Sequence, residues 1–368
     1  MKIGLLGFGV VGKGVYDIIR TRTDMSVTKI LCLEQIDLED AQAVHNYLEI
    51  VNDPEIDTVV EAIGGLHPAY EMVRAALEAG KNVVSSNKAL VCNFYDELLP
   101  LAKEMGVSFR CTAAVGGGIG WLSELERARR VQSFTQIWGI MNGTCNYILD
   151  NMTRKGLDYS DVLKQAQALG YAEANPSTDV EGTDTWHKII LSSSIAWGIT
   201  VDKASVPVAG ISRISAADVD AFKAHGRVCK LIGTGKKENG VYSIYVQPTL
   251  FADGEMEAAV PMNYNLITFV GETSERMSFY GQGAGRYPTA YNVVQDLVDV
   301  TEGKGFYAPY GPRITAENGE KLRYYVRGGW DGATEEAWGD AVITEPVSVS
   351  KMHAWLKDHP DAFIAALR

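Results

Sequence analysis

The chain has 368 residues, of which 46% are hydrophobic and 22% charged, and this balance excludes a wholly disordered protein. A length of this size favours two domains over one. The formal net charge is −12 and no basic block is present, so nothing in the charge pattern supports a nucleic-acid or anionic-membrane partner. No run of 18 apolar residues occurs, which argues against a membrane-spanning helix.

The five cysteines are widely separated and never form a C-x-x-C pair, which argues against a disulfide framework and a zinc knuckle. They are Cys32, Cys92, Cys111, Cys145 and Cys229. We therefore expect a cytoplasmic protein that acts on a small molecule. The basic residue and apolar run at the start of the chain resemble a signal peptide, but the glycines within that run argue against one.

Residues 1–112 show strand-like runs that alternate with helical periodicity. The expected strands are 2–6, 28–33, 58–63, 82–85 and 107–111, and the expected helices are 12–22, 38–51, 69–79 and 94–105. This alternation predicts an α/β domain with a Rossmann-type doubly wound parallel sheet.

Residues 113–280 show a different pattern, which predicts a second domain of the α+β class. Its expected helices are 120–131, 144–155, 160–169 and 184–198, its expected strands are 133–141, 227–234, 241–247 and 266–271, and residues 171–183 are expected to form a loop. An open sheet needs its edges or faces covered, so we expect this domain to support a homodimer. A further helix is expected over 286–301.

A glycine motif lies between the first expected strand and the first helix, with the sequence Gly7-Phe8-Gly9-Val10-Val11-Gly12. Glycines at this spacing allow a tight turn whose N–H groups hold a pyrophosphate, although an ordinary β–α turn is the simpler alternative. Glu34 ends the second strand with no Arg or Lys beside it, which favours NAD over NADP unless Glu34 is only solvated.

Lys88 follows the fourth expected strand within the run Ser85-Ser86-Asn87-Lys88. Ligands of doubly wound sheets bind beyond the carboxyl ends of the strands, so Lys88 is a candidate proton relay or substrate anchor, or else a solvated charge. We also assign Gly64, Gly65, Ser86, Asn87 and Gly285 to the cofactor site.

Asp184 and Lys188 are four residues apart on one expected helix, which places them within ion-pair reach. The apolar residues that follow them, such as Ile189 and Ile190, indicate that this helix is buried, and buried charges require partners or a function. Desolvation can lower a lysine pKa toward neutrality, which suits proton exchange with an alkoxide. The alternatives are a surface pair, or a nucleophilic Cys145, whereas His187 points away from Lys188 and is expected to be structural.

Three further motifs resemble homoserine dehydrogenases. They are Asn142-Gly143-Thr144-Cys145-Asn146-Tyr147-Ile148-Leu149, the run from Gly170-Tyr171-Ala172-Glu173 to Asp184 and Lys188, and Gly281-Gln282-Gly283-Ala284-Gly285 followed by Pro288-Thr289-Ala290. The resemblance covers roughly residues 1–303. It implies the NAD(P)-dependent interconversion of L-homoserine and L-aspartate 4-semialdehyde, a dimerising substrate domain, and a segment 281–305 that returns to the cofactor domain.

The resemblance also implies roles for individual residues. Lys188 matches the acid/base lysine, Lys88 the lysine beside nicotinamide and substrate, and Glu173 the carboxylate that binds the substrate's amino group. Asp179 and Asp184 match the acidic residues that complete this polar pocket, and the remaining substrate contacts are assigned to Gly143, Thr144 and Tyr171.

The sequence departs from the family pattern at several positions. Thr112 stands where Glu is common in the metal loop, so sodium would rely on the backbone carbonyls of Val115, Gly117 and Ile119. Gly120 replaces a usual proline and Asn175 a usual aspartate, which leaves open an oxidoreductase for a related amino-acid aldehyde or keto acid. A non-catalytic dinucleotide sensor is disfavoured because Lys88, Glu173, Asp184 and Lys188 are all present.

The last part of the chain begins like an ACT regulatory domain at Lys321-Leu322-Arg323-Tyr324-Tyr325-Val326-Arg327, but it is too short to complete one. We therefore expect residues 306–368 to form a C-terminal appendage that covers the subunit or its dimer partner.

Overall fold

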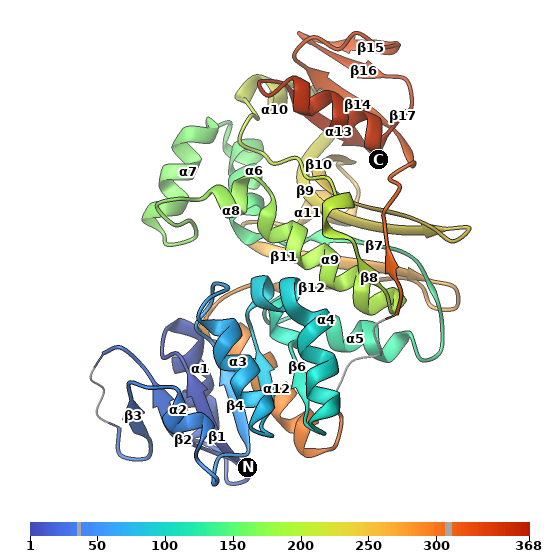
Figure 1. Ribbon diagram of the computed structural model, residues 1–368. Helices are drawn as coiled ribbons and strands as arrows, with labels where there is room; N and C mark the ends of the chain where they lie inside the picture. The colour runs from blue at the N-terminus through green and yellow to red at the C-terminus, as the bar shows by residue number, and fades with distance from the viewer. Residues whose placement is uncertain (35–37, 306–310) are drawn as a thin grey trace. The chain divides into compact units, whose positions relative to one another are not determined.

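The computed structural model describes residues 1–34, 38–305 and 311–368, and the chain divides into two compact units (Figure 1). The first unit comprises Met1–Arg130 and Gln282–Gly311, and the second comprises Val131–Gly281 and Pro312–Arg368. Residues 113–130, which we expected in the second domain, therefore belong to the first unit. The start of the expected appendage, residues 306–310, lies outside the described residues.

The first unit contains a parallel sheet with the strand order β3-β2-β1-β4-β5-β6. These strands are β1 (Lys2–Leu6), β2 (Ser26–Leu31), β3 (Gln42–Val44), β4 (Thr58–Glu61), β5 (Asn82–Ser85) and β6 (Phe109–Arg110). The order reverses between β1 and β4, so the Rossmann-type doubly wound sheet is confirmed, with all five expected strands present.

Helices cover both faces of this sheet. They are α1 (Val10–Ile19), α2 (Leu48–Val51), α3 (Ala69–Glu78), α4 (Lys88–Glu104), α5 (Trp121–Ala128) and α12 (Arg286–Thr301), with a short 3₁₀ turn η1 (Thr112–Ala114). Val15 of α1 and Val293 of α12 pack with Ile3 of β1 in one core. The other face is covered by α3 and α4, which pack against each other. The expected helix 286–301 is confirmed as α12.

Two expected helices of the first unit differ from the structure. The prediction of a helix over 38–51 is wrong, because this segment contains the edge strand β3 and a single turn, α2. Pairing of β3 with β2 is a non-local contact that the helical periodicity of the segment does not reveal. The helix expected over 94–105 begins earlier, at Lys88, where the side chain of Asn87 accepts a hydrogen bond from the Leu90 N–H as an N-cap.

The second unit contains a long mixed sheet with the strand order β12-β11-β7-β9-β10-β18-β14-β16-β15. Its strands are β7 (Phe134–Ile140), β9 (Arg227–Glu238), β10 (Val241–Ala252), β11 (Tyr264–Gly271), β12 (Glu275–Gln282), β14 (Lys321–Arg327), β15 (Thr334–Trp338), β16 (Ala341–Thr344) and β18 (Phe363–Leu367). Three short strands stand outside this order: β17 (Val347–Ser348) pairs with β14, and β8 (Thr200–Val201) pairs with β13 (Arg313–Ile314) in a separate sheet of two strands.

The helices of the second unit pack on this sheet or on one another. They are α6 (Gly143–Lys155), α7 (Tyr159–Ala168), α8 (Ser177–Val180), α9 (Thr183–Trp197), α10 (Ala216–Ala224), α11 (Met256–Ala259) and α13 (Val349–Asp358), with a 3₁₀ turn η2 (Lys203–Ser205). Two glycines of β9 allow α9 to approach closely: a Cβ added at Gly233 would lie 3.0 Å from the Ile189 Cβ, and one at Gly235 would lie 2.8 Å from the Ser193 Oγ. This contact fixes the helix that carries Asp184 and Lys188. The segment 171–183, expected as a loop, contains the single turn α8.

The C-terminal segment continues the sheet of the second unit (Figure 1). Strand β18 pairs in parallel with β10, with Ala366 opposite Thr249, and pairs antiparallel with β14. Met352 of α13 packs with Tyr324 and Ile364 in a shared core. None of the helices in the described part of the chain is both long and apolar enough to span a bilayer.

Candidate active site

A buried cluster of polar side chains lies where the N-termini of α6 and α9 meet α8. We call Asn142, Asp179, Asp184 and Lys188 the polar cluster. The Lys188 Nζ donates to Asp184 Oδ2 at 2.7 Å and to the backbone carbonyl of Met141 at 2.6 Å. Asp184 and Lys188 are only 2% and 7% exposed. The surface-pair alternative is therefore wrong, and the ammonium has a fixed position.

Asn142 joins the two carboxylates of the polar cluster. Its side-chain nitrogen donates to Asp179 Oδ1 at 2.7 Å and to Asp184 Oδ2 at 2.8 Å, while its oxygen accepts from the Cys145 N–H as the N-cap of α6. Both ends of the amide are thus used, which fixes its orientation. The sequence motif that contains Asn142 did not reveal this role, although an Asn before a helical run is a typical N-cap signal.

The Asp179 carboxyl has a pKa that its surroundings raise. Burial raises its pKa above the usual value of 3.8; the hydrogen bond from Asn142 opposes this, while the nearby charge of Asp184 adds to it. The positive charge of Lys188 and a hydrogen bond from Thr144 also oppose the rise. A cation beside Asp179 would favour its ionised form, so this carboxylate suits a substrate ammonium.

Three other residues were expected to contact the substrate. Gly143 and Thr144 begin α6, and Tyr171 lies close to them. The Thr144 hydroxyl donates to the Tyr171 carbonyl at 2.6 Å, and the Tyr171 ring lies 5.0 Å from that of Tyr147. At Gly143 an added Cβ would lie 2.7 Å from the Asn263 carbonyl oxygen, so only glycine fits there. These contacts join the start of α6 to the 171 segment.

Glu173 lies apart from the polar cluster's hydrogen bonds. Its side chain belongs to an exposed stretch, and its backbone carbonyl accepts from the Gln167 side chain at 3.1 Å. Within the described residues, no contact joins its carboxylate to the cluster. Its role in binding the substrate's amino group stays a prediction.

Cys145 is unsuited to act as a nucleophile. It is fully buried, its Sγ donates to the Asp179 carbonyl at 3.2 Å, and burial raises the pKa of the thiol well above its usual value. A thiolate is the reactive form of cysteine. The nucleophile alternative is therefore wrong. His187 packs edge-on against Trp186, with ring centroids 5.1 Å apart, in keeping with a structural role.

The turn between β1 and α1 has the shape that a dinucleotide requires. Gly7 has a φ of +99°, and a Cβ added at Gly12 would lie 2.2 Å from the Gly7 carbonyl oxygen. A Cβ added at Gly9 would meet no atom within 4 Å, so open space lies beside the N-terminus of α1. The first N–H groups of a helix have no partners within it, which makes this turn fit a pyrophosphate. Val10 is exposed there, and Phe8 and Val11 are partly buried.

Glu61 is a buried carboxylate that orders the loops after β4 and β5. It accepts hydrogen bonds from the N–H groups of Ile63 and Gly64 at 2.9 and 3.1 Å, and from the Ser85 hydroxyl at 2.6 Å. The Asn87 side chain donates to it at 3.4 Å and to the Gly65 carbonyl at 2.6 Å. Three residues that we assigned to the cofactor site, Gly64, Gly65 and Asn87, thus lie in loops that one carboxylate holds together, and Lys88 follows Asn87 as the first residue of α4.

The other residues assigned to the cofactor site lie at the ends of strands and the starts of helices. Gly64 and Gly65 have φ values of +85° and +72°, and Gly285 of +122° precedes α12. Ser86 and Lys88 are partly buried at the start of α4, and Glu34 is exposed beyond the carboxyl end of β2. Sequence reasoning missed Glu61, although a carboxylate at the end of an apolar strand is a signal of a buried, hydrogen-bonded group.

Comparisons with known proteins decide the family. A model described as the homoserine dehydrogenase NAD-binding domain matches residues 7–112, and the homoserine dehydrogenase model matches residues 121–298. The homoserine dehydrogenase of Bacillus subtilis (strain 168) is 37% identical over 314 residues, which cover 82% of this chain and 72% of that protein. The chain belongs to the homoserine dehydrogenase family. It is accordingly an oxidoreductase with an NAD(P)-binding domain.

Some solved homoserine dehydrogenases share the fold over the whole chain. The crystal structure of the Thiobacillus denitrificans homoserine dehydrogenase has a TM-score of 0.90 and 30% identity, and the match covers 100% of this chain and 98% of that one. A Staphylococcus aureus homoserine dehydrogenase has a TM-score of 0.79 at 27% identity, with the same coverage. The C-terminal strands therefore belong to an architecture that other members of the family also have.

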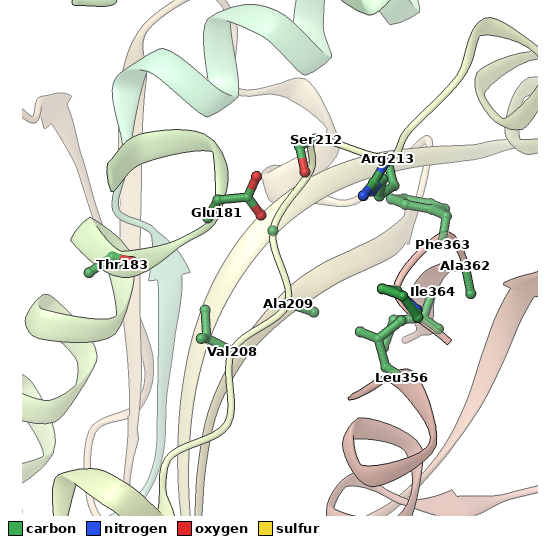
Figure 2. Close-up of a pocket in the computed structure, with 12 residues that line it drawn as sticks. Glu181, Thr183, Val208, Ala209, Ser212, Arg213, Leu356, Ala362, Phe363 and Ile364 are labelled. Carbon is green, nitrogen blue, oxygen red and sulfur yellow. The ribbon is translucent and has the colours of Figure 1, made fainter. Parts of the chain in front are cut away.

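A hollow of about 590 Å³ adjoins the turn between α8 and α9 in this member of the homoserine dehydrogenase family (Figure 2). Figure 2 shows the segment of Val208, Ala209 and Ser212 running between Glu181 on one side and Leu356 and Phe363 on the other. Its wall at Gly210 touches the turn directly: a Cβ added there would lie 2.2 Å from the Val180 carbonyl oxygen. The backbone around Gly210 thus supports the turn that places Asp179 and Asp184.

Proposed function

We propose that this protein interconverts L-homoserine and L-aspartate 4-semialdehyde, with Lys188 exchanging the proton of the substrate oxygen. The observation that carries the proposal is the buried ammonium of Lys188, held by Asp184 and the Met141 carbonyl. When bound, the nicotinamide cofactor accepts or supplies the hydride at the reacting carbon. Oxidation of the alcohol releases a proton from its oxygen, and reduction of the aldehyde takes one up there. Lys188 receives or donates that proton.

Asp184 acts as a positioning residue in this scheme. Its Oδ2 accepts from both Lys188 and Asn142, so the carboxylate holds the ammonium and is itself held by the N-cap of α6. The negative charge balances the buried positive charge when Lys188 is protonated. Burial also excludes water from the lysine, which limits unproductive proton exchange.

The substrate's amino group is proposed to bind carboxylates, because an ammonium needs a negative partner. Asp179 is the first candidate, since it belongs to the polar cluster and keeps a fixed orientation through Asn142. Glu173 is proposed as a second partner that approaches when substrate binds. Gly143, Thr144 and Tyr171 would shape the pocket around the substrate's carbon chain.

The proposed cofactor is NAD. Glu34 follows β2 with its side chain exposed, and a carboxylate there would accept hydrogen bonds from the adenosine ribose hydroxyls and repel a 2′-phosphate. Comparing kcat/KM with NAD and NADP tests this choice. A strong preference for NADP would overturn it, and Glu34→Gln should relax the discrimination.

A homodimer in the cytoplasm is also proposed. All five cysteines are free thiols, as a reducing compartment allows. Apolar side chains are exposed around the edge strand β12 and α11, namely Met256, Met262, Met277 and Tyr280. A second copy covering this surface would bury them. Light scattering on the purified protein tests the dimer, and a monomer at micromolar concentration would contradict it.

The test of the proposed reaction compares two lysine variants. Lys188→Ala should lower kcat by about 10²–10⁴-fold, the range for loss of a general acid–base group, while the affinity for the cofactor stays near wild type. Lys164→Ala removes an exposed lysine of α7 and should leave kcat unchanged. Near-normal turnover by Lys188→Ala would refute the assigned role. Oxidation of other hydroxy amino acids in preference to homoserine would favour the related-substrate alternative.

A further inference from the structure

The loop from Thr112 to Ile119, here called the 112–119 loop, is held by the segment that returns to the first unit. The Gly118 N–H donates to the Gln282 carbonyl at 3.0 Å, and a Cβ added at Gly117 would lie 2.5 Å from the Gly283 carbonyl. Val115 is fully buried in this loop. The resemblance to the family implies a sodium ion here, so the donors present can be compared with what a cation needs.

The carboxylate beside the loop is already paired with groups of the protein. Asp296 of α12 is 1% exposed and accepts from the Thr112 N–H at 2.7 Å and the Thr112 hydroxyl at 2.6 Å. The Arg110 guanidinium, 3% exposed, donates to the same carboxylate at 2.9 Å. The positive charge that balances Asp296 therefore comes from the protein. A cation placed nearby would be repelled by Arg110 without gaining a free negative ligand.

Two of the three backbone carbonyls that were expected to bind sodium accept hydrogen bonds from N–H groups instead. The side-chain nitrogen of Asn292, a residue 2% exposed on α12, donates to the Gly117 carbonyl at 2.5 Å. The Ile119 carbonyl accepts from the Trp121 N–H at 2.7 Å. Amide hydrogens carry partial positive charge, so they compete with a cation for the same oxygen. Together with Thr112 in place of the usual Glu, these contacts do not fit a sodium site.

We propose that Asn292 and Asp296 of α12 hold the 112–119 loop in place of a monovalent cation, so that folding and turnover of this protein need no sodium. The two side chains are one helical turn apart and meet the loop at both ends, at Gly117 and at Thr112. Arg110 supplies the charge that the ion would otherwise provide. Rigidity of the loop is thus a property of the chain itself.

The direct test measures thermal unfolding of the full chain in chloride salts of sodium, potassium and choline at equal ionic strength. We expect the three melting temperatures to agree within about 1 °C, and homoserine turnover to agree within about twofold. A clear loss of melting temperature in choline would overturn the proposal. Thermal unfolding does not require turnover, so this result stands apart from failure of the proposed reaction.

A charge variant with a matched control tests the role of Asn292. Asn292→Asp replaces the donor by a carboxylate that faces the Gly117 carbonyl, and should lower the melting temperature in choline by on the order of 5 °C or more. Sodium should restore part of this loss, because the variant supplies the missing negative ligand. Gln295→Glu adds the same charge on the exposed side of α12 and should change little.

The outcomes for Asn292→Asp separate the proposal from its rivals. Wild-type stability in choline would show that Asn292 does not hold the loop. If the melting temperature of Asn292→Asp is lowered as much in sodium as in choline, the idea that Asn292 takes the place of a cation is contradicted. If the variant does not fold, Asn292→Ala removes the donor without adding charge, and its melting temperature should still fall below that of wild type.

Discussion

Removing Asp184 should destabilise the second unit strongly, because it leaves the Lys188 ammonium buried without its counter-ion. Lys188 would keep only its hydrogen bond to the Met141 carbonyl. Breaking a buried ion pair in this way costs about 3–5 kcal/mol. At about 2–4 °C per kcal/mol for a unit of this size, Asp184→Ala should melt about 6–20 °C below wild type.

The double variant Asp184→Ala/Lys188→Met distinguishes this explanation from a simple packing defect. Methionine removes the charge while filling a similar volume, so the double variant should recover more than half of the loss in melting temperature. Asp161→Ala is a matched control, since it breaks an exposed i,i+3 pair with Lys164 and should shift the midpoint by about 2 °C or less. A double variant no more stable than Asp184→Ala would refute the reasoning.

Glu61→Ala should raise KM for the cofactor about tenfold or more, because the loops after β4 and β5 lose a shared hydrogen-bond acceptor. The melting temperature of the cofactor-free variant should fall by a few degrees. An unchanged KM would exclude Glu61 as a positioning residue. Gly210→Ala should lower kcat/KM for homoserine because its Cβ would displace Val180; Gly254→Ala, which meets open space, is the control. Because the pKa of Asp179 is raised, the decrease of kcat/KM for homoserine on acidification should begin at a higher pH than an ordinary aspartate would give. Asp179→Asn should abolish this decrease. If the variant shows the same decrease, another group is responsible for it.

The pair of Asp184 and Lys188 could be predicted because its evidence is local. Their spacing gives one helix face, and the apolar residues that follow indicate burial, so the sequence alone pointed to a constrained ion pair. The same holds for the β1–α1 turn, where the glycine spacing predicts both the backbone shape and the open helix N-terminus. In these places the chemistry depends on neighbours within a few turns of chain.

Asn142 and Glu61 could not be assigned roles in the same way, because their partners come from other elements. Asn142 meets Asp179 and Asp184 only when the N-terminus of α6 lies beside α8 and α9. Glu61 acquires its role from Ser85, which belongs to the neighbouring strand. Hydrogen bonds between separate elements depend on strand register and on packing, and the hydrophobic periodicity of the sequence predicts neither.

The C-terminal segment and β3 illustrate the same limit for the fold. Strand β18 pairs with β10 across more than a hundred residues of sequence, with Ala366 opposite Thr249. Strand β3 forms because it pairs with β2 at the edge of the sheet, although the apolar residues of its segment, 38–51, repeat with helical spacing. In both cases a non-local pairing decides the structure.

Chemical rescue of Lys188→Ala tests the central claim most directly. The measurement is the rate of homoserine oxidation by this variant, with saturating cofactor, as small primary amines of graded pKa are added. If Lys188 exchanges the proton of the substrate oxygen, the rate should rise with amine concentration, and its logarithm should increase with amine pKa with a slope between zero and one. A variant that binds substrate and cofactor normally and turns over near the wild-type rate without any amine would contradict the account.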